Sequence, residues 1–423
     1  MSEPAPALRT EIIAGITTFF TVAYIVVVNP TILAQSGMAF SAVLTATVIL
    51  ACSMTLFMGL YAKLPFAVAP GMGINAFFTF TLVLGQGVPW RTALGMVFWS
   101  GVLFIVVSVT PLREQVARAI PANLRSAAAV GIGLFLTFIG LKSASFIAAD
   151  PVTFVRVGHF DRGTGLALVG LVVILVLLRR HNPLSFLAGI AVATAGALAL
   201  GLTKVPDAAV AAPDFSAMWQ LDIAGSLRLA LLPAIVSLFF TDLFDSISTF
   251  VGVAQATGLV DERGEPKNLR RGLVVDAFAT FGAGLLGTSA GTAYIESAAG
   301  IAVGGRTGRT AVVTALCFLP CLFIAPLAGM VPGFATAPVL IVVGASMFKA
   351  VKSITLDQVE DALPAFLTVA LIPLTFSITQ GILWGFVSHT VLYVLAGRRR
   401  EISPMLVVIS GISAGLLVLE AVR

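Results

Sequence analysis

Charged residues are scarce in this chain. Asp, Glu, Lys and Arg make up 11% of its 423 residues, whereas 58% are hydrophobic. The mean hydropathy of +1.03 excludes a water-soluble protein of this length, because soluble domains carry about 25% charged residues. We therefore expect an all-α polytopic protein embedded in a lipid bilayer.

Cysteine and histidine are scarce as well. The three cysteines, Cys52, Cys317 and Cys321, lie in apolar runs without the spacing of metal ligands. They are interpreted as packing thiols, so no disulfide framework is implied. The histidines have no evident catalytic partners, and we expect no metal, no cofactor and no enzymatic activity.

Long apolar runs fill most of the chain. A helix needs about 20 apolar residues to cross a bilayer, and we expect about fourteen segments, some of half length. They fall near 12–33, 42–62, 64–84, 92–110, 121–141, 164–178 and 184–203, and again near 228–256, 270–287, 288–304, 308–329, 332–348, 363–378 and 380–396. A last apolar run, 403–420, fits neither set, and its placement stays open.

The charges are distributed unevenly. There are 25 basic and 20 acidic residues, and basic residues of membrane proteins gather in cytoplasmic loops, so the excess indicates topology rather than nucleic-acid binding. A cytoplasmic N-terminus in the plasma membrane, the inner membrane of a bacterium, places most of them inside. These are Arg113, Arg118, Arg125, Arg179, Arg180, Arg263, Lys267, Arg270, Arg271, Arg306, Arg309, Lys349, Lys352 and Arg398 to Arg400.

The two sets of segments form an internal repeat. Phe19-Phe-Thr21 recurs as Phe239-Phe-Thr241, and Ala34-Gln35 recurs as Ala254-Gln255, both after 220 residues. The units are 12–203 and 228–396. Seven segments is an odd number, so the repeats must insert with opposite orientation, which is typical of transporters with a site at the membrane midplane.

Two segments are broken by residues that disfavour helices. Segment 64–84 contains Pro70 and Gly71, and 288–304 is rich in Gly, Ser and Thr. Non-helical backbone within a membrane is tolerated where it lines a cavity or is covered by protein. Glu296 begins the second half-helix, where backbone N–H groups favour negative charge, and Asn75 holds the matching position in the first. Each is a candidate substrate ligand, with capping of its helix as the alternative.

An acidic helix lies upstream. Asp242, Asp245 and Thr249 share one face of it, and an ionised side chain in hydrocarbon costs several kcal/mol, so we expect these residues to line the site. Asp245 and Glu296 are the principal candidates for binding, and Asp242, Asp245 and Glu296 for carrying a coupled proton. For Asp242, bonding between helices is an equally good alternative.

Further residues complete the candidate set. Tyr24 and Tyr294 lie in segments expected to border the cavity, and Ala23 and Ile295 stand beside them in the chain. Asp276 is expected to be structural. Glu11 is expected to cap the first helix, and Asn29-Pro30 to bend it.

Such a site suits a flat heterocycle with several donors and acceptors. Two or three carboxylates would repel a small inorganic anion unless protonated. An intramembrane aspartyl protease is disfavoured, because its two Asp residues must come from two helices, whereas Asp242 and Asp245 share one. A passive channel, a non-transporting receptor, or a transporter of a pyrimidine, ascorbate or an anion remains an alternative.

Several long motifs resemble those of the AzgA-like purine permeases, in the nucleobase transporter superfamily that includes uracil permease. They are residues 14–30, 69–76, 242–245, 287–300 and 304–308. The resemblance implies fourteen segments in two inverted repeats, with short antiparallel strands in the third and tenth. It also implies a core domain (12–110 and 228–329) that moves, elevator-like, against a gate domain (121–203 and 332–396).

The resemblance further implies a function. Members of this purine permease family take up adenine, guanine and hypoxanthine with protons, and the family positions that contact the base match Asp245 and Glu296. Some relatives carry a second ionisable residue four positions after the one that matches Asp245, where this chain has Thr249. Whether Asp242 carries the coupled proton instead is therefore left open. The preferred purine and a homodimer are left open too.

Overall fold

Fourteen helical or broken segments make up the two repeats, as the sequence predicts. The computed structural model describes residues 6–110, 119–260 and 266–421, so Arg113, Arg118 and Arg263 lie outside the described residues. The first repeat comprises α1 (Leu8–Val22), α2 (Ile25–Leu33), α3 (Phe40–Phe57), β1 (Val68–Pro70), α4 (Met72–Ala76), α5 (Trp90–Val109), α7 (Ala122–Ser143), α8 (Arg162–Arg179) and α9 (Ser185–Ala199). The second comprises α10 (Leu232–Thr257), α11 (Leu269–Leu286), β4 (Gly291–Ala293), α12 (Ser297–Ala302), α13 (Gly308–Phe318), α14 (Ala325–Gly329), α15 (Gly333–Phe348), α16 (Val359–Leu374) and α17 (Ile378–Leu395).

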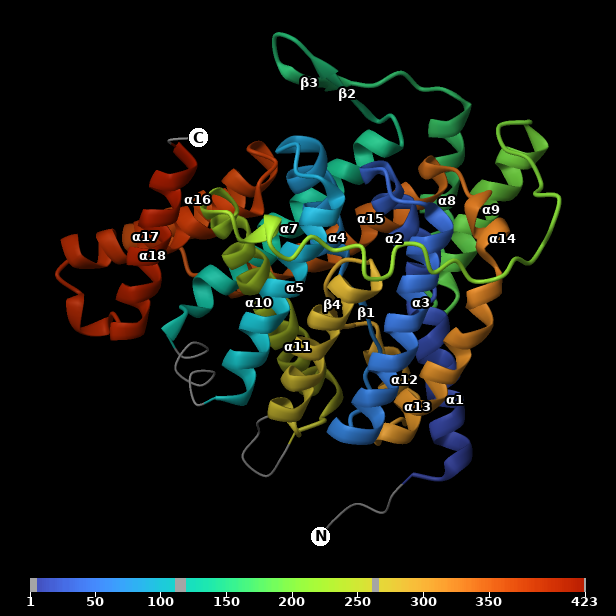
Figure 1. Ribbon diagram of the computed structural model, residues 1–423, viewed down its shortest axis with the longest axis horizontal. Helices are drawn as coiled ribbons and strands as arrows, with labels where there is room; N and C mark the ends of the chain where they lie inside the picture. The colour runs from blue at the N-terminus through green and yellow to red at the C-terminus, as the bar shows by residue number, and fades with distance from the viewer. Residues whose placement is uncertain (1–5, 111–118, 261–265, 422–423) are drawn as a thin grey trace.

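Many of these helices can span a bilayer. Within the described residues, 8 helices are long and apolar enough to cross a membrane, and shorter apolar helices accompany them. Figure 1 shows the helices packed side by side, with the N-terminal end at the lower edge. The expectation of a polytopic helical membrane protein is confirmed.

The two broken segments meet in the middle of the molecule. β1 and β4 pair antiparallel, and Pro70 lies opposite Gly291. These two residues are 221 positions apart, the same displacement as that between Asn75 and Glu296. The strands are buried, so their backbone groups need partners. The Thr55 hydroxyl pairs with Val68 N at 2.9 Å, and the Tyr294 hydroxyl donates to Pro70 O. The predicted strands are thus confirmed.

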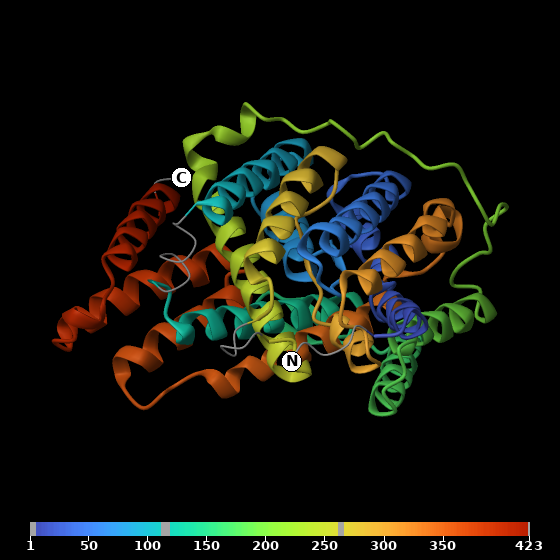
Figure 2. The same cartoon turned by 90° about the horizontal axis from the view of Figure 1, so that it is seen from below.

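The helices form two packed groups (Figure 2). The first, which we call the strand layer, holds α1 to α5 and α10 to α13 around the two strands. The second, the α7–α15 layer, holds α7, α8, α9, α15, α16 and α17, and within it α7 packs most extensively against α15. The extra apolar run forms α18 (Pro404–Ala421), which packs on α17 and also touches α10.

A hairpin between α7 and α8 was not expected from the sequence. β2 (Ile147–Asp150) pairs with β3 (Phe154–Val157), and Figure 1 shows it projecting from the edge opposite the N-terminal end. The apolar side chains of β3 are exposed, with Phe154 at 84%, whereas Ile147 and Ala148 of β2 are half-buried. Hydropathy does not distinguish such short strands from loop.

One local expectation was wrong, and one feature was not expected. The first helix is interrupted at Ala23 and Tyr24, a break that the sequence did not indicate, and Pro30 lies inside α2. Glu11 does not cap its own helix. Its buried carboxylate accepts hydrogen bonds from Thr310 N (3.2 Å) and the Thr310 hydroxyl, at the start of α13.

Candidate functional site

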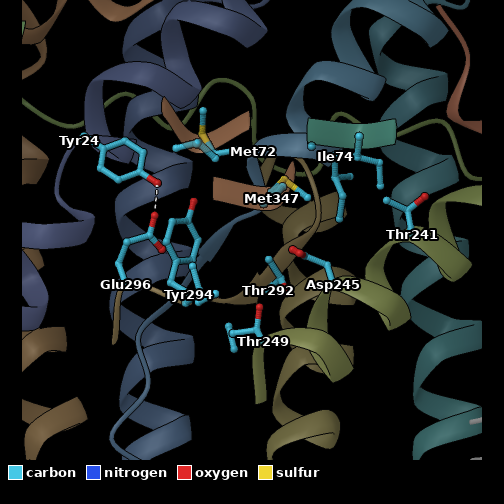
Figure 3. Close-up of a pocket in the computed structure, with 16 residues that line it drawn as sticks. Tyr24, Met72, Ile74, Thr241, Asp245, Thr249, Thr292, Tyr294, Glu296 and Met347 are labelled. Atoms are coloured by element: carbon cyan, nitrogen blue, oxygen red, sulfur yellow. Dashed lines mark hydrogen bonds between the residues drawn. The ribbon is translucent and has the colours of Figure 1, made fainter. Parts of the chain in front are cut away.

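A cavity lies where the paired strands face the α7–α15 layer. The space inside it that water-sized molecules can occupy is about 70 Å³. Its walls come from both repeats and from both layers (Figure 3). They are formed by Tyr24, Gly71, Met72, Gly73, Ile74, Ile132, Thr241, Asp245, Thr249, Thr292, Ala293, Tyr294, Ile295, Glu296, Val343 and Met347.

Glu296 provides one polar end of the cavity. It directly precedes α12 and lies just past the end of β4, so the break in the segment brings its side chain to the middle of the molecule. Its Oε1 accepts a hydrogen bond of 2.8 Å from the hydroxyl of Tyr24. The interruption between α1 and α2 places Tyr24 there, and its side chain is completely buried.

Asp245 provides the other polar end. It lies on α10 with Thr241 one turn before it and Thr249 one turn after it, and all three line the cavity. The hydroxyl of Thr292, on β4, lies beside the Asp245 carboxylate. The helix period therefore presents a polar stripe to the cavity.

The faces between these two ends are apolar. Ile74 and Met72 line the cavity from the first broken segment, whereas Ile132, Val343 and Met347 line it from α7 and α15. Apolar walls with a few polar groups between them suit an aromatic ring. The three residues from the α7–α15 layer could not be found from the sequence, because nothing local marks them as facing a cavity.

A second pair of carboxylates lies behind β4. Asp242 Oδ2 accepts a hydrogen bond from the Thr280 hydroxyl, which also lies 3.2 Å from Gly291 O. Asp276 Oδ2 accepts one from Ala293 N at 3.2 Å. Neither Asp lines the cavity, and both are completely buried. Asp276 thus contacts β4 directly, whereas Asp242 is connected to it through Thr280.

The structure brings together most of the predicted site residues. Asp245, Glu296, Thr249, Tyr24 and Ile295 line the cavity, and Ile295 is 55% exposed at its edge.

Three candidates lie outside the cavity wall. Asp242, which was expected to line the site, lies behind β4, and the other two lie elsewhere. Asn75 is completely buried and its Oδ1 accepts a hydrogen bond from the hydroxyl of Ser289, which ties the two broken segments together. Ala23 is buried at the helix interruption. Neither is part of the cavity wall.

Sequence reasoning missed Thr241 and Thr292. Thr241 had a usable signal, because it precedes Asp245 by four residues and therefore shares its helix face. Its hydroxyl is buried and has no hydrogen-bond partner within the described residues. Among all the residues that the structure describes, no three His, Cys, Asp or Glu side chains are grouped so as to hold a metal ion.

Comparison with known proteins gives the context of this site. Residues 9–383 match the model of a family described as a permease family. The chain is 45% identical to the putative permease MJ0326 of Methanocaldococcus jannaschii over 96% of this chain and 94% of the relative. It is 40% identical to the adenine permease AdeP of Escherichia coli (97% and 93% covered), and 40% identical to the guanine/hypoxanthine permease PbuO of Bacillus subtilis (96% and 96%).

Solved structures share the fold. The transmembrane domain of a cyanobacterium bicarbonate transporter, BicA, superimposes with a TM-score of 0.67 at 19% identity, covering 89% of this chain and 97% of that one. The murine anion transporter Slc26a9 superimposes with a TM-score of 0.63 at 11% identity, covering 94% and 69%. At these identities the likeness concerns the fold alone.

Proposed function

Because the chain belongs to this permease family of transporters, whose adenine and guanine/hypoxanthine permeases resemble it over nearly their whole length, we propose that it takes up purine nucleobases by proton symport. The observation that carries the proposal is the placement of Glu296 and Asp245 at two polar ends of one cavity with apolar faces. A purine offers N–H groups along its edge and two apolar faces, so carboxylates can accept from the edge while side chains cover the faces.

The carboxylates also support coupling to protons. Asp245 and Glu296 line the cavity, and Asp242 lies behind its strand. An ionised carboxylate away from water is costly without a partner, so uptake and release of a proton can accompany uptake and release of the base. The proposal places the N-terminus in the cytoplasm and the protein in the plasma membrane, the inner membrane of a bacterium, from the distribution of basic residues.

We further propose that one layer moves against the other. The cavity is bounded by the strand layer on one side and by Ile132, Val343 and Met347 of the α7–α15 layer on the other. In the proposed cycle, the strand layer is the core (12–110 and 228–329) and the α7–α15 layer is the gate (121–203 and 332–396). The core carries the base past the gate as an elevator does.

Transport into proteoliposomes tests the proposal. Labelled adenine, guanine or hypoxanthine should accumulate inside above its outside concentration when the outside is made acidic, and an uncoupler should abolish the accumulation. Equilibration without accumulation would indicate a passive channel. An excess of unlabelled uracil, xanthine, ascorbate or bicarbonate in the same assay tests the alternative cargoes, since only a true substrate should compete.

Two conservative variants test the site. Asp245→Asn and Glu296→Gln keep the shape of each side chain but remove its charge, so each should abolish concentrative uptake. A hydrogen bond to a charged acceptor contributes about 3 kcal/mol, so the uptake rate should fall at least about 100-fold. Both proteins should still reach the membrane in normal amounts. Retained transport in both variants would exclude this site.

A further inference from the structure

Tyr24 lies where the cavity meets the α7–α15 layer. Its ring packs against Phe186 of α9, with ring centroids 4.8 Å apart, and its hydroxyl donates to Glu296 over 2.8 Å. One buried side chain therefore contacts both a carboxylate of the cavity and a helix of the opposite layer (Figure 3 shows the contact with Glu296).

We propose that the Tyr24 hydroxyl takes the place of the substrate on Glu296 when the carrier is empty, and that an N–H group of the incoming base displaces it. This inference rests on the proposed function. Tyr24 would then be the residue that allows the empty carrier to return across the membrane for another molecule of base.

The physical reason concerns the return step. A loaded carrier has the donors of the base to satisfy Glu296, whereas an empty one must satisfy the carboxylate with its own groups or with water. Leaving a buried acceptor without a donor raises the free energy of that state. A phenolic O–H donates much as a ring N–H does, so the exchange of one for the other keeps Glu296 hydrogen-bonded throughout.

Two other hydroxyls of the cavity have partners away from Glu296. The hydroxyl of Tyr294 donates to Pro70 O across the strands, and that of Thr292 lies 3.3 Å from the hydroxyl of Ser246. Among the described residues that line the cavity, Tyr24 thus provides the side-chain donor to Glu296.

The second repeat shows which part of Tyr24 the fold itself requires. The residue 220 positions later is Phe244, and its ring packs against Phe386 of α17 with centroids 6.3 Å apart. Both repeats therefore pack an aromatic ring of the strand layer on a phenylalanine of the other layer. The fold accounts for the ring of Tyr24, but its hydroxyl has no equivalent in Phe244, so it needs a separate reason.

Tyr24→Phe separates these two parts, because it keeps the ring against Phe186 and removes the hydroxyl. Tyr61→Phe is the matched control, since it removes the hydroxyl of a half-exposed tyrosine that does not line the cavity. Two rates are compared in proteoliposomes. Exchange of labelled for unlabelled adenine uses only the loaded carrier, whereas net uptake driven by a proton gradient also needs the empty carrier to return.

We expect the ratio of net uptake to exchange to fall at least tenfold in Tyr24→Phe and to stay within about twofold of the wild-type ratio in Tyr61→Phe. An unchanged ratio in Tyr24→Phe would overturn the inference, whether both rates fall together or neither falls. Thermal-shift binding of adenine to the purified variant checks that it is folded. Absence of purine exchange in the wild type would instead contradict the proposed function.

Discussion

Gly133 of α7 and Gly344 of α15 meet backbone to backbone. A Cβ atom on Gly344 would lie 2.3 Å from the carbonyl oxygen of Gly133, and one on Gly133 would lie 2.6 Å from that of Gly344. Pro121 and Pro332, which precede the two helices, are separated by the same number of residues as the glycines. The repeats therefore meet at equivalent positions here, as they do at Pro70 and Gly291 in the strands.

Gly344→Ala should destabilise the protein. The added methyl group has no room against the backbone of Gly133, and overpacking of this kind costs about 1–3 kcal/mol. We expect a lower melting temperature in detergent, measured by scanning fluorimetry. Gly411→Ala is the control, because nothing surrounds a Cβ at that position of α18, and it should melt at or slightly above the wild-type temperature. Equal melting temperatures for Gly344→Ala and wild type would contradict the close contact.

Asp242→Asn should separate binding from proton coupling. The amide can still pair with Thr280, which now contacts Asp242 Oδ2, but it cannot exchange a proton. If Asp242 carries the proton, the variant should still bind and exchange adenine, while net uptake loses its dependence on external pH between about 5 and 8. Uptake rates across that range provide the measurement, and an unchanged pH profile would move the role to Asp245 or Glu296.

Glu11→Ala should weaken the junction of α1 with α13. The substitution leaves the buried N–H and hydroxyl of Thr310 without the carboxylate that they now contact, which costs about 1–3 kcal/mol. Glu401→Ala is a suitable comparison, because its ion pair with Arg398 lies at the surface, with the Glu401 side chain 53% exposed, and such pairs contribute about 0–1 kcal/mol. Chemical or thermal unfolding should show Glu11→Ala to be much less stable than Glu401→Ala.

Asp161 should make the stability of the folded protein depend on pH in the acidic range. Its carboxylate caps α8 by accepting from Thr164 N at 2.7 Å, and this bond lowers the pKa of Asp161. A lowered pKa favours the ionised folded state, so the contribution is complete above the ordinary aspartate pKa of about 3.9 and is lost as the pH falls through the lower folded value. The difference in melting temperature between wild type and Asp161→Ala should shrink below about pH 4. A constant difference from pH 6 to pH 3 would be the contrary result.

Much of the fold follows from local patterns. Apolar runs of about 20 residues define segments wherever they occur, and Pro70, Gly71 and the Gly-rich stretch before Glu296 mark the breaks in any context. The shared face of Asp245 and Thr249 follows from the helix period. These features need no knowledge of distant residues, and the structure reproduces the segments, the breaks and the strands.

Other features depend on contacts across long stretches of chain. Glu11 contacts Thr310 instead of its own helix, and Asn75 pairs with Ser289 rather than lining the cavity. A buried polar group takes the partner that packing brings within reach, and its neighbours in sequence do not identify that partner.

The sequence by itself determined that the chain enters a membrane, that it is built from two opposed copies of one unit, and where each unit is broken, because hydropathy, helix period and backbone preference act over a few residues. Only the tertiary structure decided which side chains line the cavity, that Tyr24 donates a hydrogen bond to Glu296, and that α7 and α15 come into backbone contact at Gly133 and Gly344. Those outcomes depend on how helices far apart in the chain fit together, and the packing of side chains at such contacts is fixed only when both surfaces are in place.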